Sequence, residues 1–213
     1  MAHALALTVA AIVTGTLHVR AEYRGPRRLV YLFKPLTTVL ILTLALTTAA
    51  PVSATYRAAI VLGLVCSLAG DVFLMLPKDR FLPGVASFLM AHVAYLVGFT
   101  TDVRFGVMPL LLVPCVLLGA AMLGLLWHGL GTMRAPVIVY LVVILAMLWQ
   151  AVTRGVLLGA TGAWLAAVGA AVFVVSDSAL ALDRFRKPYR TAQAVILPTY
   201  YAAQLLIAWS VAG

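Results

Sequence analysis

Charged residues are scarce in this sequence, and acidic residues are the scarcest of all. Only 10% of the 213 residues are charged, and only six are Asp or Glu. A soluble domain is roughly one quarter charged residues, because its outer faces meet water. The shortage therefore excludes an ordinary water-soluble domain.

Alternating patterns and paired cysteines are missing as well. No segment alternates polar and apolar residues over about ten positions, as a lipid-spanning β-strand would. The two cysteines, Cys66 and Cys115, both lie inside apolar blocks. Cysteine in such surroundings behaves as a small hydrophobic residue, so the sequence indicates neither a disulfide nor a redox role.

Long apolar blocks dominate what is present. Hydrophobic residues make up 64% of the chain, and the blocks lack a polar stripe, which is typical of helices surrounded by lipid. The sequence therefore predicts an all-α, multi-pass bundle in the cell membrane, with one transmembrane domain over residues 1–213. About eight spans are expected, at residues 4–19, 29–49, 57–76, 84–100, 106–127, 135–150, 156–182 and 191–211.

Basic residues gather in alternate loops. The first, third, fifth and seventh loops hold eleven Lys and Arg residues, whereas the other three hold only Arg57, Arg104 and Arg154. The positive-inside rule then places the odd loops in the cytoplasm and both termini outside. The net charge of +9 is divided among short gaps and forms no continuous stripe, so we expect no nucleic-acid partner.

Two segments resemble each other, GDVFLMLPKDRF (70–81) and SDSALALDRF (176–185). They fall at the cytoplasmic ends of the third and seventh predicted spans, where two parallel four-helix repeats would place them. The alternative is that cytoplasmic helix ends attract arginine without any duplication.

Two acidic residues, Asp71 and Asp177, fall inside predicted spans. Each lies five residues before the expected cytoplasmic interface, or about 7–8 Å at the helical rise per residue. A carboxylate at that depth costs up to a few kcal/mol, so such residues usually face a cavity or a partner. We interpret both as candidate functional residues; the structural alternative is pairing with a loop arginine or capping of a neighbouring helix.

Lys34 and His92 are further polar residues within the apolar blocks. Lys34 precedes Pro35, so it either binds an anionic group or extends to the headgroups from a helix that begins at the proline. His92 is expected about 12 Å inside its span, where it either takes part in catalysis or packs as a hydrogen-bonded core residue.

The last predicted span carries three more polar residues, Tyr200, Tyr201 and Gln204. Residues three or four apart share a helix face, so Gln204 is a neighbour of both tyrosines.

Other chemistries have little support. The chain contains neither a GxSxG elbow nor a glycine-rich phosphate loop. Zinc requires three or four ligands, and His92 is the only histidine in the middle of a span. We therefore expect no metal and no cofactor, although a metal held by His92, Asp71 and Asp177 stays open as an alternative.

Several stretches resemble one family of membrane proteins. They are FKPLTTVLIL (33–42), SLAGDVFLMLP (67–77), FLPGVASFLMAHVAYLVGF (81–99), GAAVFVVSDSALALDRF (169–185) and LPTYYAAQLLI (197–207). Their order and the spacing of the two Asp motifs resemble the YhhN family, whose characterised members are lysoplasmalogenases. The resemblance implies hydrolysis of the vinyl ether bond of lysoplasmalogens, giving a fatty aldehyde and glycerophospho-ethanolamine or -choline. It also implies two essential acidic residues, and the matching positions are Asp71 and Asp177.

Vinyl ether hydrolysis suits two buried carboxyl groups. Protonation of the β-carbon requires an acid that keeps its proton near neutral pH, and removal from water favours the neutral carboxyl form. A second carboxylate can stabilise the resulting oxocarbenium ion or activate water, as in glycosidases. One proton shared between Asp71 and Asp177 would serve both needs if their helices are adjacent.

The remaining candidates are expected to bind substrate. Lys34 would hold the lipid phosphate at the cytoplasmic headgroup level, which places the active site near the cytoplasmic side. His92, Tyr200, Tyr201 and Gln204 would shape the polar end of the pocket.

The competing interpretation is a proton-coupled lipid or small-molecule transporter, or a lipid-binding membrane protein without catalysis. Transporters also place buried acids at matching positions of two repeats. The enzyme interpretation predicts a lysophospholipid substrate within membrane lipid as the partner, and the sequence makes no prediction of oligomeric state.

Overall fold

Eight long helices account for the architecture. The computed structural model describes residues 2–77 and 80–212, and within these it holds eight helices apolar and long enough to cross a membrane and no strand. The all-α, multi-pass prediction is confirmed. The helices are α1 (Ala2–Arg24), α2 (Arg27–Thr47), α3 (Ala54–Met75), α4 (Phe81–Phe99), α5 (Leu112–Leu126), α6 (Arg134–Leu158), α7 (Thr161–Phe185) and α8 (Ala192–Trp209), with short 3-10 turns at Pro109–Leu111, Gly131–Met133 and Ser210–Ala212.

α2 begins at an earlier residue than one of the two interpretations of Lys34 requires. The helix begins at Arg27, and Pro35 lies inside it. Lys34 is therefore a residue of the second helical turn, and the interpretation in which the helix starts at Pro35 is wrong. Membrane helices tolerate an internal proline because neighbouring groups satisfy the freed backbone carbonyl.

The end of α6 also lies beyond the predicted position. The helix continues to Leu158, so Arg154 lies inside it and not in the sixth loop. The arginine side chain is buried and bonds to both carboxylate oxygens of Asp102, at 2.7–3.0 Å. Its guanidinium also stacks on the ring of Tyr56, 4.5 Å from the centroid. These partners allow a charged residue to remain in the helix.

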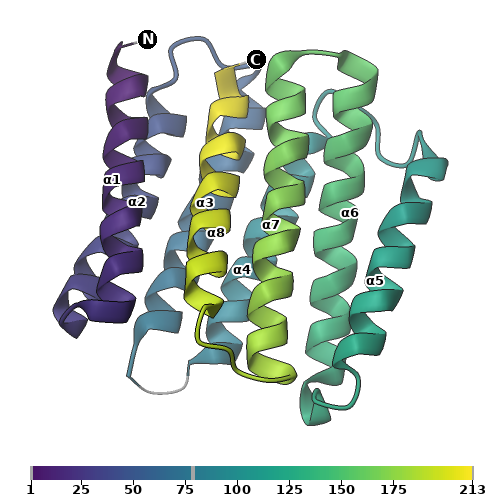
Figure 1. Ribbon diagram of the computed structural model, residues 1–213. Helices are drawn as coiled ribbons and strands as arrows, with labels where there is room; N and C mark the ends of the chain where they lie inside the picture. The colour runs from purple at the N-terminus through teal and green to yellow at the C-terminus, as the bar shows by residue number, and fades with distance from the viewer. Residues whose placement is uncertain (1, 78–79, 213) are drawn as a thin grey trace.

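Most helices pack in a closed circuit. α1 packs on α2, α2 on α3, α3 on α4, α4 on α6, α6 on α7, α7 on α8 and α8 on α1, while α8 also contacts α2 inside the circuit. α5 packs mainly on α6 and lies at the edge of the bundle (Figure 1). The outer helix surfaces carry many exposed large hydrophobic side chains, as expected in lipid.

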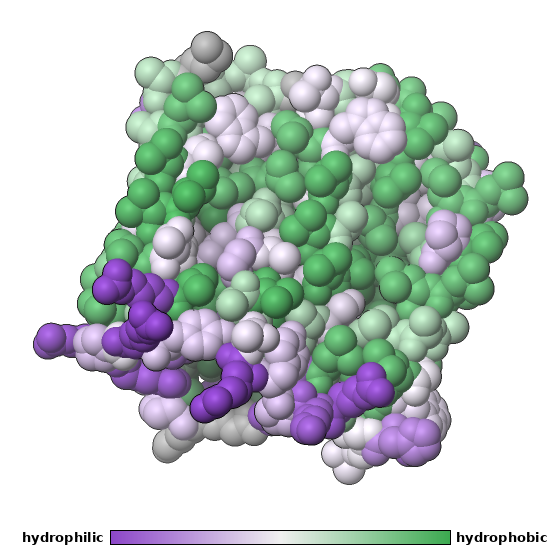
Figure 2. Space-filling view, viewed as in Figure 1, coloured by the Kyte–Doolittle hydropathy of each residue, from purple (hydrophilic) through white to green (hydrophobic). Residues whose placement is uncertain are grey.

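Charge is concentrated at one end of the bundle. The connections after α1, α3, α5 and α7 meet there, and we call this the basic end. Figure 2 shows hydrophilic residues gathered along this edge and a largely hydrophobic surface above it. Both termini lie at the opposite end (Figure 1). That the basic end faces the cytoplasm stays a prediction from the positive-inside rule.

The packing partners match the repeat that the sequence suggests. If α3 corresponds to α7, then α4 corresponds to α8 and α2 to α6. The structure accordingly pairs α3 with α4 and α7 with α8, and it packs α4 on α6 as it packs α8 on α2. Lys78 and Asp79 of the first repeated segment lie outside the described residues.

Candidate active site

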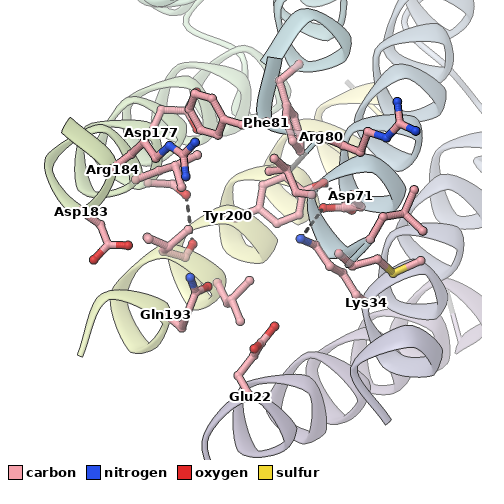
Figure 3. A pocket seen from close by; sticks show the side chains of 18 of the residues that line it. Glu22, Lys34, Asp71, Arg80, Phe81, Asp177, Asp183, Arg184, Gln193 and Tyr200 are labelled. Carbon is pink, nitrogen blue, oxygen red and sulfur yellow. Dashed lines mark hydrogen bonds and ion pairs between the residues drawn. The ribbon is translucent and has the colours of Figure 1, made fainter. Parts of the chain in front are cut away.

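A cavity of about 520 Å³ extends from the basic end to both candidate aspartates. Residues Leu76 and Pro77, between α3 and α4, line its mouth, and Asp71, Asp177 and Lys34 line its inner part. Figure 3 shows Lys34 and Tyr200 pointing toward Asp71, with Asp177 on the other side of the cavity. The structure thus brings four of the predicted site residues, Lys34, Asp71, Asp177 and Tyr200, to one cavity.

Asp71 is buried in α3 among hydrogen-bond donors. Its Oδ2 accepts hydrogen bonds from the Thr38 hydroxyl at 2.6 Å and from the Tyr200 hydroxyl at 2.8 Å. The Lys34 ammonium lies 3.8 Å from Oδ1. Each of these neighbours presents a proton to the carboxyl group, so Asp71 is an acceptor in this arrangement.

Asp177 has a more open setting in α7, with 16% of its side chain exposed. Its Oδ2 accepts a hydrogen bond from the Tyr140 hydroxyl at 2.5 Å and lies 3.1 Å from His92 Nε2. His92 is fully buried, and its Nε2 is also 2.9 Å from the Tyr140 hydroxyl. Among the described residues, none is hydrogen-bonded to Asp177 Oδ1, so this oxygen is free to meet a molecule in the cavity.

Within the described residues no hydrogen bond joins the two carboxyl groups. α3 packs on α2 and α4, whereas α7 packs on α6 and α8, so the adjacency that direct sharing requires is absent. Aromatic rings occupy the space near both groups: Tyr200 lies 5.7 Å from Phe88 and 5.6 Å from Phe173, between ring centroids. The helices of the two carboxyl groups are not packed on each other and each group has its own donors, so direct sharing of a proton has no support in the contacts and stays a prediction.

The two donor sets correspond to each other across the repeat. Asp71 of α3 bonds to Thr38 of α2 and Tyr200 of α8. Asp177 of α7 bonds to Tyr140 of α6 and His92 of α4. Each aspartate is therefore held by the preceding helix of its own half and by the last helix of the other half. This exchange ties the two halves together at the cavity.

The mouth of the cavity carries charges of both signs. Its lining includes the cations Arg27, Arg80 and Arg184 and the carboxylates of Glu22 and Asp183. Such a mixture suits a zwitterionic headgroup, because phosphate binds guanidinium groups and an ammonium binds carboxylates.

Tyr189, in the connection after α7, contributes to the electrostatics of this end. Partial burial and the nearby Asp183 carboxylate raise the pKa of its phenol, so the phenol is neutral at physiological pH. Its backbone N–H donates to Asp183 Oδ1 at 3.0 Å, which positions that carboxylate beside the mouth.

Tyr201 and Gln204 do not reach the cavity. The Tyr201 hydroxyl lies 2.8 Å from His18 Nδ1 on α1. Gln204 is fully buried, and its Oε1 accepts from the Tyr95 hydroxyl at 2.6 Å. Both residues join helices within the core, so the expectation that they contact substrate is without geometric support.

The structure also bears on the open alternative of a metal site. Within residues 2–77 and 80–212 no three His, Cys, Asp or Glu side chains come together. His92 contacts Asp177 but not Asp71, so the set of His92, Asp71 and Asp177 is not formed.

Comparison with known proteins supplies the family. The profile of the YhhN family matches residues 29–211, which include every residue of the cavity wall except Glu22 and Arg27. The chain belongs to the YhhN family. No solved structure matches it.

Two kinds of relative of this YhhN protein stand out. The Escherichia coli O157:H7 membrane protein YhhN is 30% identical over 202 residues, which cover 93% of this chain and 95% of that one. Human lysoplasmalogenase TMEM86B is 40% identical over 148 residues, 69% of this chain and 60% of that one. Bovine lysoplasmalogenase TMEM86A is 37% identical over 159 residues, 71% and 64% of the two chains. This YhhN protein therefore spans less than two thirds of the lysoplasmalogenases it resembles.

Two residues of the site escaped the sequence analysis, Thr38 and Tyr140. Thr38 lies four residues after Lys34 and so on the same face of α2, which was a usable signal. Tyr140 stands alone in the apolar segment VIVYLVV, and a lone tyrosine in such a run gives no indication of its partner. Only the packing of α6 against α7 brings its hydroxyl to Asp177.

Proposed function

We propose that this YhhN protein hydrolyses the vinyl ether bond of lysoplasmalogens, with Asp71 and Asp177 as the catalytic residues. The observation that carries the proposal is the single cavity that both carboxyl groups line at the charged end of a membrane bundle. Relatives named lysoplasmalogenase, at 36–40% identity, support the same reaction.

Asp177 is assigned the role of acid. Its Oδ1 is free of protein partners among the described residues, while Oδ2 is fixed by Tyr140 and His92. A proton on Oδ1 would pass to the β-carbon of the vinyl ether and leave an oxocarbenium ion at the α-carbon. A fixed carboxyl with one free oxygen is suited to such a transfer, because its geometry is set before the substrate arrives.

Asp71 is assigned to stabilise the cation and to accept a proton from water. Water adds to the α-carbon and gives a hemiacetal, and its proton passes to Asp71. The hemiacetal then loses the glycerol oxygen as an alcohol and becomes an aldehyde. Water in the cavity returns the proton from Asp71 to Asp177, which restores both groups. This division of roles follows two-carboxylate glycosidases, in which a water molecule occupies the space between separated acids.

Lys34 and the mouth residues are assigned to the headgroup. Lys34 is a cation within the cavity, and Arg27, Arg80 and Arg184 lie farther out. A phosphate between these groups would place the glycerol near the aspartates. Glu22 and Asp183 would then face the ammonium of ethanolamine or choline.

Product analysis tests the function. Purified protein in nanodiscs is incubated with 1-alkenyl lysophosphatidylethanolamine, and released aldehyde and glycerophosphoethanolamine are measured by mass spectrometry. The two products should appear in equal amounts. Alkyl ether and acyl ester analogues of the same chain length should remain intact, because neither has the carbon–carbon double bond beside the ether oxygen that the proposed step protonates.

The Asp71→Asn/Asp177→Asn double variant provides the matched control and should release no aldehyde. Equal release by the double variant would contradict the two-aspartate proposal. Movement of lipid across the bilayer without aldehyde would favour the transporter alternative.

A further inference from the structure

A second cavity adjoins the active site and differs from it in character. It is a narrow groove between α4, α5, α6 and α7, and thirteen of its sixteen lining residues are apolar. Val85, Met122, Leu126, Leu141, Ile144 and Ala181 are among them. We call it the apolar groove.

The groove and the active-site cavity meet at Asp177. Four residues line both spaces: Phe81, Phe88, Asp177 and Leu180. Asp177 is the only carboxyl group among them, so it stands where the charged cavity ends and the apolar groove begins. Asp71, in contrast, lines the charged cavity and not the apolar groove.

The groove exists because the two halves of the bundle are not packed alike. α1 and α5 hold corresponding places in the repeat. α1 closes the first half by packing on α8, with contacts such as Trp209 Nε1 to Thr8 Oγ1 at 3.0 Å. α5 instead packs on α6 and touches α7, without a corresponding interface with α4. The space that α1 fills in one half is therefore left as a groove in the other.

We propose that the apolar groove binds the hydrocarbon chain of a single-chain ether phospholipid and thereby holds the vinyl ether bond at Asp177. This inference rests on the proposed function and names the site of its substrate chain. α4 and α5 would form the sides through which the chain enters from the membrane.

The distribution of polarity supports this occupant. A lysoplasmalogen has a charged headgroup, a short glycerol link and one long chain, with the vinyl ether between the polar and apolar parts. The two adjoining spaces offer the same three parts: arginines and carboxylates line the charged cavity, Asp177 lines both spaces, and mainly apolar side chains line the groove. Burying the chain in the groove removes its apolar surface from water, although a chain arriving from lipid gains little because it is already in apolar surroundings. The groove therefore serves to position the hydrocarbon chain more than to strengthen its binding.

A bulky side chain in the groove tests the inference by kinetics. Ala181→Phe places a ring among the groove residues, whereas Ala171→Phe places the same ring on the exposed side of α7. Ala181→Phe should lower kcat/KM for a hexadecenyl substrate by about tenfold or more, and it should lower kcat/KM less for an octenyl substrate, whose shorter chain fills less of the groove. Ala171→Phe should change neither. An equal loss for both chain lengths, or no loss for the longer one, would overturn the assignment.

Photolabelling tests the groove without any turnover. The probe is a 1-O-alkyl lysophosphatidylethanolamine with a diazirine in mid-chain, which the proposed reaction cannot cleave. Irradiation in nanodiscs should label peptides from α5 (Leu112–Leu126) and from residues 137–144 of α6. Excess unlabelled alkyl lysolipid should reduce this labelling, whereas the same amount of diacyl phosphatidylethanolamine should not. Labelling elsewhere, or labelling that the lysolipid does not reduce, would refute the groove as the chain site.

The two tests separate failure of the groove from failure of the proposed function. If the wild type releases no aldehyde but competed labelling appears in α5 and α6, the chain site stands and the reaction is another one. If aldehyde is released but labelling falls on α1 or α2, the reaction stands and the chain site is refuted.

Discussion

The two aspartates of the cavity differ in their surroundings. Asp71 is 1% exposed and faces an ammonium and two hydroxyl groups. Asp177 is partly exposed, and only one of its oxygens is bonded to described residues. This difference underlies the assignment of Asp177 as the acid and Asp71 as the acceptor.

Replacement of either aspartate by asparagine should lower kcat strongly. Asparagine retains the shape but cannot exchange the proton, and loss of a general acid or base typically costs 10² to 10⁴ in rate. Single-turnover release of aldehyde by Asp71→Asn and Asp177→Asn measures the effect, with elution volume and melting temperature in detergent as the folding control. Activity within about tenfold of wild type in either variant would contradict a catalytic role for that residue.

Lys34 provides a test of what its ammonium does. Because Nζ lies 3.8 Å from Asp71 Oδ1, we expect Lys34→Met to lower kcat as well as to weaken headgroup binding. Lys34→Arg keeps the charge with a different geometry and should retain part of the activity. Steady-state kinetics of both variants distinguish the roles. A rise of KM at unchanged kcat in Lys34→Met would assign the ammonium to phosphate alone, since that contact is equal in ground and transition states.

At the scale of helices, the two ends of the bundle are built differently. The basic end contains the cavity, whereas the opposite end contains a network of Arg154, Asp102 and Tyr56, in which the Tyr56 hydroxyl also lies 2.7 Å from Ser210 Oγ. This network joins α3, α6 and the end of α8 to the segment after α4. We interpret it as structural.

Removal of the Arg154 guanidinium should therefore affect stability and not chemistry. Arg154→Met leaves Asp102 without its partner, and breaking a buried ion pair costs about 3–5 kcal/mol, less where one member is partly exposed. The melting temperature in detergent should fall, while kcat per folded molecule remains that of wild type.

Arg57→Met is the matched control for this variant. Arg57 lies at the same end, and within the described residues its guanidinium donates only one hydrogen bond, at 3.4 Å to the Thr48 carbonyl, so its replacement should change the melting temperature little. A loss of kcat in folded Arg154→Met would show that the two ends of the bundle are coupled.

At the scale of the whole molecule, charge asymmetry predicts orientation. The basic end should face the cytoplasm, with both termini outside. Single cysteines at Ala49 and Lys187, introduced after Cys66 and Cys115 are replaced by alanine, probe opposite ends of the bundle. A membrane-impermeant maleimide should label Ala49→Cys in intact cells and Lys187→Cys only after lysis. The reverse pattern would invert the orientation and place the cavity mouth outside.

The sequence by itself determined that this is an eight-helix membrane protein with two unusual acids. The length of an apolar block and the cost of a carboxylate in lipid depend only on the local sequence. Composition and spacing are therefore sufficient to predict the spans and to select the two acids. For the same reason Asp71 and Asp177 could be selected before any contact was known. The helix ends near Lys34 and Arg154 do not follow from such local quantities, because a charged residue ends a span only when no partner within the bundle compensates its charge.

The tertiary structure decided which groups face each other. Nothing along the chain relates Tyr140 to Asp177, Thr38 to Asp71 or Gln204 to Tyr95, since these pairs depend on how whole helices pack. The same packing gives each carboxyl group its own donors, turns Tyr201 toward His18, and leaves α5 away from α4. In lipid, helices that are apolar on all sides provide no sequence pattern for choosing neighbours, because small packing and hydrogen-bonding differences between surfaces make that choice.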